Sequence, residues 1–181
     1  MSLRSDEMLE AFINKMIRNK DIMDILKLPT ILKTDTDEII NKKRKVLINK
    51  VIVKSSQEPT ELNKKFPEVT IDDVTYKDYG DTRITVALAQ SIKTNSYLFG
   101  NPQVEINIYY DNTKMLNVFK LLDLISDEFS GQDLKVPIED GKAQMLKEIK
   151  CEGITAQVAI INNFERVGIR FSFYSTLYKV L

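Results

Sequence analysis

The residues that could do chemistry in this chain are of few kinds. Its 181 residues include no histidine and a single cysteine, Cys151. Without histidine there is no imidazole base, no Ser-His-Asp triad and no histidine ligand for zinc, and one cysteine cannot build a thiolate zinc or iron–sulfur site. The six glycines are dispersed and form no phosphate-binding loop. We therefore expect no catalytic, cofactor-binding or metal-binding residues, and no enzyme.

Carboxylates are the main chemical groups that remain. Four aspartates follow one another closely along the chain: Asp72, Asp73, Asp78 and Asp81. Acids of this kind hold catalytic divalent metals when they converge in one cleft. Nothing in their spacing fixes such convergence, so we interpret them as a solvated acidic segment. A small metal-dependent enzyme using this cluster remains an alternative.

Basic residues gather at one place in the chain. The cluster consists of six side chains: Lys42, Lys43, Arg44, Lys45, Lys50 and Lys54. We expect the first four on the exposed side of a helix that begins after Thr36. A nucleic-acid-binding module using residues 42–54 is a second alternative, with weak and salt-sensitive phosphate contacts. The whole chain carries 26 basic and 26 acidic residues, so it has no net charge that would attract nucleic acid or anionic membranes.

The elements that must position these side chains indicate an α+β fold. Apolar residues recur at helical spacing over residues 6–26, with an interruption near Asn19, and over residues 112–130, where Leu116 is expected to widen the apolar face. Alternation of apolar and polar residues predicts strands at residues 82–90, 104–110, 154–161 and 168–177. We expect a mainly antiparallel sheet of four or more strands, with one central helix packed on one face.

The chain is expected to form one continuous domain with two regions. Residues 1–66 form an N-terminal helical arm, and residues 67–181 form the sheet core. No apolar run approaches the ~20 residues that span a bilayer. The polar, periodic N-terminus does not resemble a secretion signal. We therefore expect no membrane partner.

Aromatic residues on the predicted outer side of the sheet are the best candidates for contact with other proteins. Alternation places Tyr109, Tyr174 and Tyr178 there, and the long loop between the first two strands carries Tyr97 and Phe99 near its tip. Amphipathic aromatic side chains are favoured at interfaces. We expect these five residues to form a partner or oligomer interface.

Three segments carry a resemblance to a known family: "NPQVEINIYYDN", "MLNVFKLLDLISDEF" and "ERVGIRFSFYSTLY". Over residues 70–181 the order of elements resembles the tail terminator and head–tail joining (neck) proteins of long-tailed bacteriophages and prophages. The resemblance implies a structural subunit that forms a homo-oligomeric ring, typically a hexamer, at the head–tail junction or tail end.

The same resemblance implies the surroundings of such a ring. Its partners would be other phage tail or neck proteins, it would have no small-molecule substrate, and it would be found in the virion and, during assembly, in the host cytoplasm. DNA would pass through the lumen, where Lys42, Lys43, Arg44 and Lys45 are the candidate DNA-facing residues.

Overall fold

The computed structural model describes residues 5–60, 62, 65–89, 103–137, 142–160 and 163–179. Its elements, in chain order, are α1 (Ser5–Met16), α2 (Lys20–Leu26), α3 (Asp37–Lys43), a π-helical turn (Arg44–Ile48), α4 (Asn49–Val51), β1 (Ile52–Lys54), β2 (Val69–Ile71), β3 (Val74–Tyr76), β4 (Thr82–Leu88), β5 (Gln103–Asp111), a 3₁₀ turn (Asn112–Lys114), α5 (Met115–Phe129), β6 (Leu134–Pro137), β7 (Lys142–Ile154), β8 (Val158–Ala159) and β9 (Phe164–Lys179).

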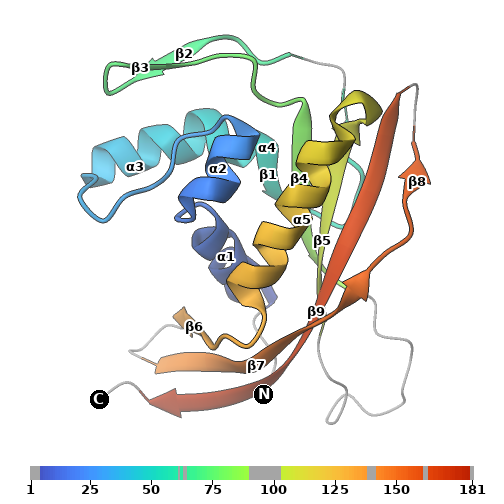
Figure 1. Cartoon of the computed structure of the whole chain (residues 1–181). Coiled ribbons are helices and arrows are strands. Elements are labelled where there is room, and N and C mark those ends of the chain that lie inside the picture. The colour runs from blue at the N-terminus through green and yellow to red at the C-terminus, as the bar shows by residue number, and fades with distance from the viewer. Residues whose placement is uncertain are drawn as a thin grey trace.

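The main sheet has seven strands in the order β1-β4-β5-β9-β7-β6, with β8 pairing with β9 beside this path. The β1–β4 pair is parallel and the other pairs are antiparallel. Strands β2 and β3 form a separate hairpin, which projects beyond the helices in Figure 1. The expected α+β fold with a mainly antiparallel sheet of four or more strands is confirmed.

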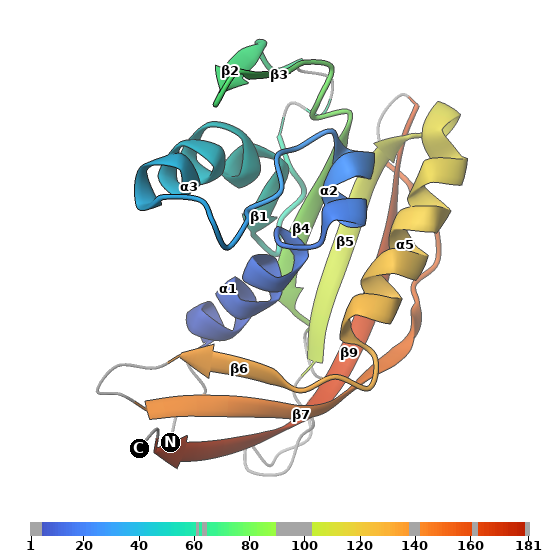
Figure 2. The same ribbon diagram turned by 60° about the vertical axis from the view of Figure 1, so that its left-hand side comes forward.

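The sheet curls around the N-terminal helices. Helix α1 packs against β1 and β4 at one end of the strand order and against β6 at the other end. Helices α1, α2 and α5 lie on the same, inner face of the sheet, as the two views in Figures 1 and 2 show. The opposite face is called the outer face below. No helix in the described ranges has the length and apolar character needed to cross a membrane.

The break that the sequence predicts near Asn19 separates α1 from α2. The Asn19 side chain accepts a hydrogen bond from the backbone N–H of Ile22, at 3.2 Å, and so caps the first turn of α2. Lys27, with φ of 56°, ends that helix in the left-handed conformation. The two short helices can therefore turn relative to each other and follow the curl of the sheet.

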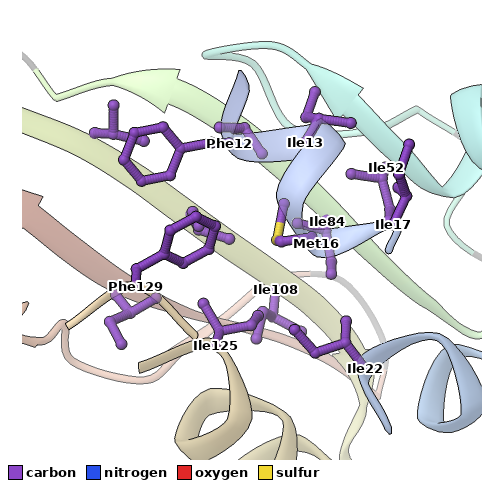
Figure 3. Close-up of a cluster of buried hydrophobic side chains, with 14 of the residues drawn as sticks. Phe12, Ile13, Met16, Ile17, Ile22, Ile52, Ile84, Ile108, Ile125 and Phe129 are labelled. Carbon is purple, nitrogen blue, oxygen red and sulfur yellow. The ribbon is translucent and has the colours of Figure 1, made fainter. Parts of the chain in front are cut away.

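One hydrophobic cluster fills the space between the sheet and the helices (Figure 3). Helix α5 contributes five buried side chains, which are Val118, Leu121, Leu122, Ile125 and Phe129. Residues of α1, such as Phe12 and Met16, belong to the same cluster as strand residues such as Ile84 and Ile108. The division into regions 1–66 and 67–181 remains a prediction, but apolar side chains of both regions pack together.

The predicted strand at residues 154–161 is wrong. The long partner of β9 is β7, which ends at Ile154, the first residue of the predicted segment. Of the other described residues of that segment, Val158 and Ala159 form a strand and the rest do not. The side chain of Ile154 is 54% exposed. The register of β7 shifts twice, and Glu148 within it has φ of 52°. Bulges of this kind interrupt the period-2 alternation from which strands are predicted.

Candidate assembly surface

Among the described residues, strand β9 has an open edge over residues 173–179, nearly half of its length. Its pairing with β5 ends at the Gln103–Ser172 pair, whereas its pairing with β7 continues to Lys179. Within the described part of the chain, no strand pairs with the other edge of residues 173–179. Unpaired backbone N–H and C=O groups along a strand edge are a template for pairing with another chain.

A pocket lies on the β7 side of this part of β9. The N–H of Gly131 donates to the carbonyl of Ile149 at 2.8 Å, and the N–H of Ile149 donates to the carbonyl of Gln132 at 3.2 Å. The bulge of β7 thus pairs with the turn after α5 instead of with β9. The resulting pocket, of about 630 Å³, is lined by the bulge, by the turn and by residues 172–174 of β9. Tyr174, whose side chain is 58% exposed, stands at this pocket.

Tyr109 lies on the outer face, as expected, but it is buried. It is the middle residue of a cross-strand row with Arg83 on β4 and Arg166 on β9. Residues 55–60, called the outer-face segment below, reach both ends of this row. The Thr60 carbonyl accepts a hydrogen bond from Arg83 Nη1 at 3.1 Å, and Glu58 pairs with Arg166 at 4.0 Å.

This crossing explains why the prediction of an exposed Tyr109 is wrong. The Tyr109 side chain is 2% exposed, although it does not belong to the inner hydrophobic cluster. It lies between the two arginines, and because the outer-face segment contacts both of them, we infer that the segment passes over Tyr109. A single strand's alternation identifies the face on which a side chain lies, but it cannot reveal a distant segment that covers that face.

The next row of the outer face consists of Thr85, Asn107 and Gly168. The Oγ1 atom of Thr85 and the Oδ1 atom of Asn107 are buried and have no hydrogen-bond partner. Gly168 leaves the space that Asn107 Oδ1 and Thr155 Oγ1 occupy. Buried polar atoms without hydrogen-bond partners reduce the stability of the fold. The hydrogen-bonding capacity of this row is therefore only partly used.

The other predicted interface residues are placed as follows. Tyr174 is exposed, as the alternation of β9 predicts, and its role in an interface remains a prediction. Tyr178 lies in β9 opposite Ala143 of β7, but its side chain is not among those described. Tyr97 and Phe99 lie outside the described residues. The interface prediction therefore depends, in the structure, on Tyr174 and on the β9 edge next to it.

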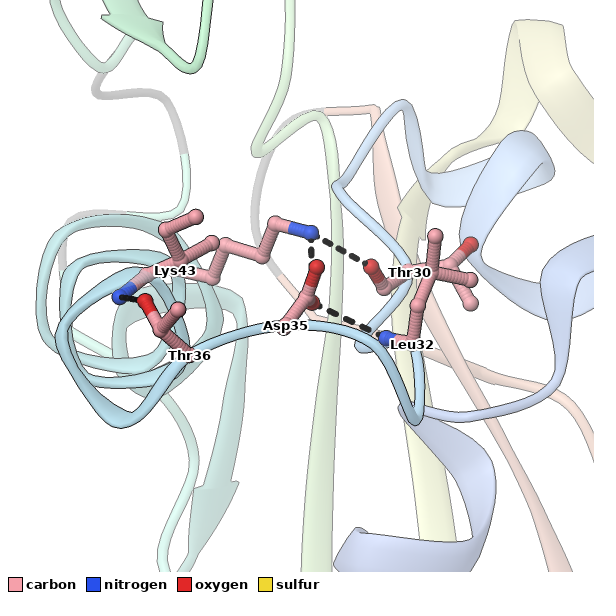
Figure 4. A network of polar contacts seen from close by, with 6 residues as sticks. Thr30, Leu32, Asp35, Thr36 and Lys43 are labelled. Atoms are coloured by element: carbon pink, nitrogen blue, oxygen red, sulfur yellow. Dashed lines mark hydrogen bonds and ion pairs between the residues drawn. The ribbon is translucent and has the colours of Figure 1, made fainter.

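The expectation that the four basic residues share an exposed face is wrong. Lys43 is 7% exposed, and its Nζ donates to Asp35 Oδ2 at 2.7 Å and to the Thr30 carbonyl at 3.0 Å (Figure 4). Arg44 is half-buried and donates to Glu10 and Asn14 of α1. Lys45 is exposed, and Lys42 is exposed while pairing with Glu38.

The physical reason is the helix itself. Successive residues of a helix point about 100° apart, so four consecutive side chains point to all sides of it. Here α3 continues into the π-helical turn at Arg44, and this places Lys43 towards the 30–35 loop and Arg44 towards α1. Lys42 and Lys45 are the members of the predicted patch that face solvent.

The four aspartates of the alternative metal site do not gather at one point. Asp72 and Asp73 form the exposed turn between β2 and β3, both with positive φ. Asp81 pairs with Lys114 at the start of α5. Among the residues that the structure describes, no group of three acidic or cysteine side chains could hold a metal ion.

Two features escape the sequence-based reasoning. Leu116, expected on the apolar face of α5, is 86% exposed, and Met115 and Phe119 beside it are 40% and 44% exposed. The sequence carried a signal for this exposure, because the apolar residues at the start of α5 span too wide an arc to be buried together.

The second feature is the environment of Tyr110. Its hydroxyl donates a hydrogen bond to Glu165 Oε2 at 3.0 Å and accepts one from Gln157 at 2.7 Å. Burial first, then this hydrogen bond and the Glu165 charge, raise the pKa of Tyr110 to about 12.

The comparisons with known proteins add no relative to this geometry. No protein-family model matches the chain, and no curated protein matches it.

Proposed function

We propose that the protein is a structural assembly subunit of a bacteriophage or prophage virion, which forms a homo-oligomeric ring at the head–tail junction or tail end. Two observations support this proposal. The order of elements over residues 70–181 resembles that of tail terminator and head–tail joining proteins. The described geometry offers an open strand edge and an exposed tyrosine. Such a function requires no catalytic residue and no cofactor.

The observation that carries the proposal is the edge of β9 at residues 173–179. A neighbouring subunit that adds a strand, or an extended segment, to this edge would satisfy its backbone groups. The edge and the segment that meets it are different surfaces, so the contact is heterologous. Heterologous contacts form closed rings when the rotation between neighbours closes. Tyr174, which is exposed and belongs to this stretch of β9, is the side chain best placed to anchor such a neighbour.

The experiment is a measurement of mass by light scattering, with electron microscopy of the same samples. We expect rings for the natural chain and a shift towards monomer for Tyr174→Glu, because a charge would be buried in the contact. Tyr174 is exposed, so this change should leave the fold intact. Leu116→Glu is the matched control, since it replaces an even more exposed apolar side chain, on α5, with the same charge. A natural chain that stays monomeric at high concentration, alone and with purified tail tubes, would contradict the proposal.

Contact between the ring and DNA is a further part of the proposal. Fewer exposed basic residues support it than the sequence suggests. Lys42 and Lys45 are the exposed residues of the basic quartet. If they line the lumen, changing both to Gln should weaken DNA binding by the ring and lower its salt dependence. Lys43 and Arg44 should not be used for this test, because they pair within the subunit.

A further inference from the structure

Among the described residues, weak contacts hold the outer-face segment to the sheet. Its residues are mostly exposed, and it meets the outer face through the Thr60–Arg83 hydrogen bond and the Glu58–Arg166 pair. Glu58 and Arg166 are 51% and 34% exposed, and an ion pair of this length in water contributes little. A single backbone hydrogen bond, from Ser55 to the Val86 carbonyl, fixes the start of the segment.

The surface below the segment is that of an interface. A buried tyrosine lies between two arginines in one row, and arginine and tyrosine are the residue types enriched in protein contacts. The unpartnered oxygens of Thr85 and Asn107 lie in the adjacent row. Within the subunit, the segment offers this surface a carboxylate from Glu58 and a carbonyl from Thr60. The chemistry that fits the row is therefore an acidic piece of chain.

The β2–β3 hairpin provides a piece of that description on every copy of the chain. Its tip consists of Asp72 and Asp73, both exposed and both in left-handed turn conformation. The hairpin is a separate two-stranded sheet that projects from the body (Figures 1 and 2). Two adjacent carboxylates on a projecting turn are complementary in charge to a row that ends in arginine on both sides.

We propose that the outer-face segment is a displaceable cover, and that its removal lets the Arg83–Tyr109–Arg166 row bind the acidic hairpin tip of a second copy. The proposal rests on the assembly function proposed above and assigns it a control step. With the cover in place, the row is satisfied within the subunit and copies do not join through it. With the cover displaced, the row is open on the outer face, and a heterologous contact between copies forms.

The test opens the cover and measures two independent quantities. Glu58→Arg places like charges together at Arg166, and Pro59→Gly loosens the segment without altering charge. Nitration with tetranitromethane, followed by peptide mass spectrometry, reports the access to Tyr109. Two other tyrosines are internal controls. Tyr110 is buried on the inner face and should resist the reagent, whereas Tyr174 is exposed and should react with it. Light scattering over a range of concentrations and salt reports association.

We expect a several-fold rise in Tyr109 nitration in both variants, with Tyr110 unchanged, and association at a several-fold lower concentration than for the natural chain. Adding Asp72→Asn and Asp73→Asn to Glu58→Arg should abolish this gain, and added salt should weaken it. Glu38→Arg, a charge reversal in an exposed ion pair away from the row, should change neither quantity.

Three outcomes would overturn the inference: unchanged Tyr109 nitration in both variants, an open Tyr109 without a gain in association, or a gain that survives loss of the two aspartates. If the natural chain nevertheless forms rings in the microscope, the proposed function stands and the covered row alone is refuted. If neither the natural chain nor any opened variant associates, both proposals fail.

Discussion

The ring of Phe12 on α1 stacks on the ring of Phe129, the last residue of α5, with centroids 4.7 Å apart and planes inclined by 28°. Both side chains are fully buried, and both also contact Phe171 of β9. Three segments that are far apart in the sequence therefore meet at one aromatic cluster. The contact fixes the N-terminal helix to the inner face of the sheet, so this helix is part of the folding core.

Phe12→Ala should destabilise the fold by about 3–5 kcal/mol, the usual cost of removing a fully buried aromatic ring. Phe129→Ala should cost a similar amount. Because the two rings stack, the double variant should be less destabilised than the sum of the single ones, by about 0.5–1.5 kcal/mol. Urea unfolding followed by circular dichroism measures all three values.

Phe119→Ala is the control for this cycle, because Phe119 belongs to α5 but is 44% exposed. Its cost should be clearly smaller than that of Phe129→Ala. A Phe12→Ala protein as stable as the natural chain would mean that α1 does not pack on the sheet in solution.

The sequence predicts most of this architecture where a strong period coincides with burial. Residues 6–26 and 112–130 have helical spacing, and residues 82–90 and 104–110 alternate, and all four segments adopt the predicted structure. The alternation at 154–161 has the same appearance but forms no continuous strand in the described residues. Strand β7 pairs with β9 as far as Ile154, residues 155–157 are not in a strand, and β8 then pairs with the next part of β9. Local periodicity does not contain the information that fixes where a strand leaves its partner.

The candidate surface is less predictable than the fold, since it depends on contacts between distant segments. The outer position of Tyr109 follows from alternation, but alternation does not reveal that Glu58 and Thr60, about fifty residues earlier, contact the arginines on both sides of it. In the described residues, the pairing of β5 with β9 ends at Ser172, whereas that of β7 with β9 continues to Lys179, and no residue type in β9 signals this difference. The pairing of Lys43 with Asp35 likewise requires the path of the 30–35 loop.

The Asp35–Lys43 pair makes stability depend on pH at the acidic end. Both side chains are less than a tenth exposed. Burial alone would raise the pKa of Asp35, but the hydrogen bonds from Lys43 and from the Leu32 N–H outweigh it, and the pKa lies below its ordinary value of 3.8. A lowered pKa in the folded state means that the pair stabilises the fold above the ordinary value. This contribution is lost as the pH falls through the lowered pKa.

Asp35→Asn should therefore reduce the loss of stability on acidification, and Asp35→Ala should cost about 1.5–3 kcal/mol at neutral pH because it removes hydrogen bonds to a charged group. Urea unfolding at a series of pH values measures both effects. Lys42→Met, at the exposed neighbouring pair with Glu38, is the control and should leave the free energy of unfolding nearly unchanged. Equal acid dependence of the natural and Asp35→Asn proteins would refute the assignment.

Tyr110 should give the opposite dependence at the alkaline end. Burial and the hydrogen bond to Glu165 raise its pKa from 10.0 to about 12, so the folded state holds the phenol proton more firmly than the unfolded chain. The stabilisation is complete below pH 10.0 and is lost as the pH rises from there through 12. Tyr110→Phe cannot titrate, so its stability should fall less over this range than that of the natural chain.

The difference between the two proteins is the quantity to measure, because burial also raises the pKa of Tyr76 and of Tyr79. Guanidinium unfolding at alkaline pH supplies the stabilities, and phenolate absorbance in the near ultraviolet supplies the titration itself. Glu165→Gln should bring the titration of Tyr110 to lower pH. Parallel stability curves for the natural chain and Tyr110→Phe would show that the phenol does not couple to folding.

Gly168→Ala tests the packing of the outer face. A Cβ at this position would lie 2.6 Å from Asn107 Oδ1 and 2.8 Å from Thr155 Oγ1, both too close for contact. Thr155 Oγ1 cannot retreat easily, because it accepts the Gly168 N–H at 2.8 Å and donates to the Gly168 carbonyl at 3.2 Å. The substitution should therefore destabilise the fold by about 1–3 kcal/mol, as overpacking does.

Asn107→Ala separates the two clashes. Asn107 Oδ1 has no hydrogen-bond partner, so its removal alone should cost little. Combined with Gly168→Ala it should recover part of the lost stability, since the shorter of the two contacts disappears. Urea unfolding of the natural chain, both single variants and the double variant gives the coupling energy. Strict additivity would show that Asn107 does not oppose a side chain at position 168, and the outer face at this row would then be looser than its burial indicates.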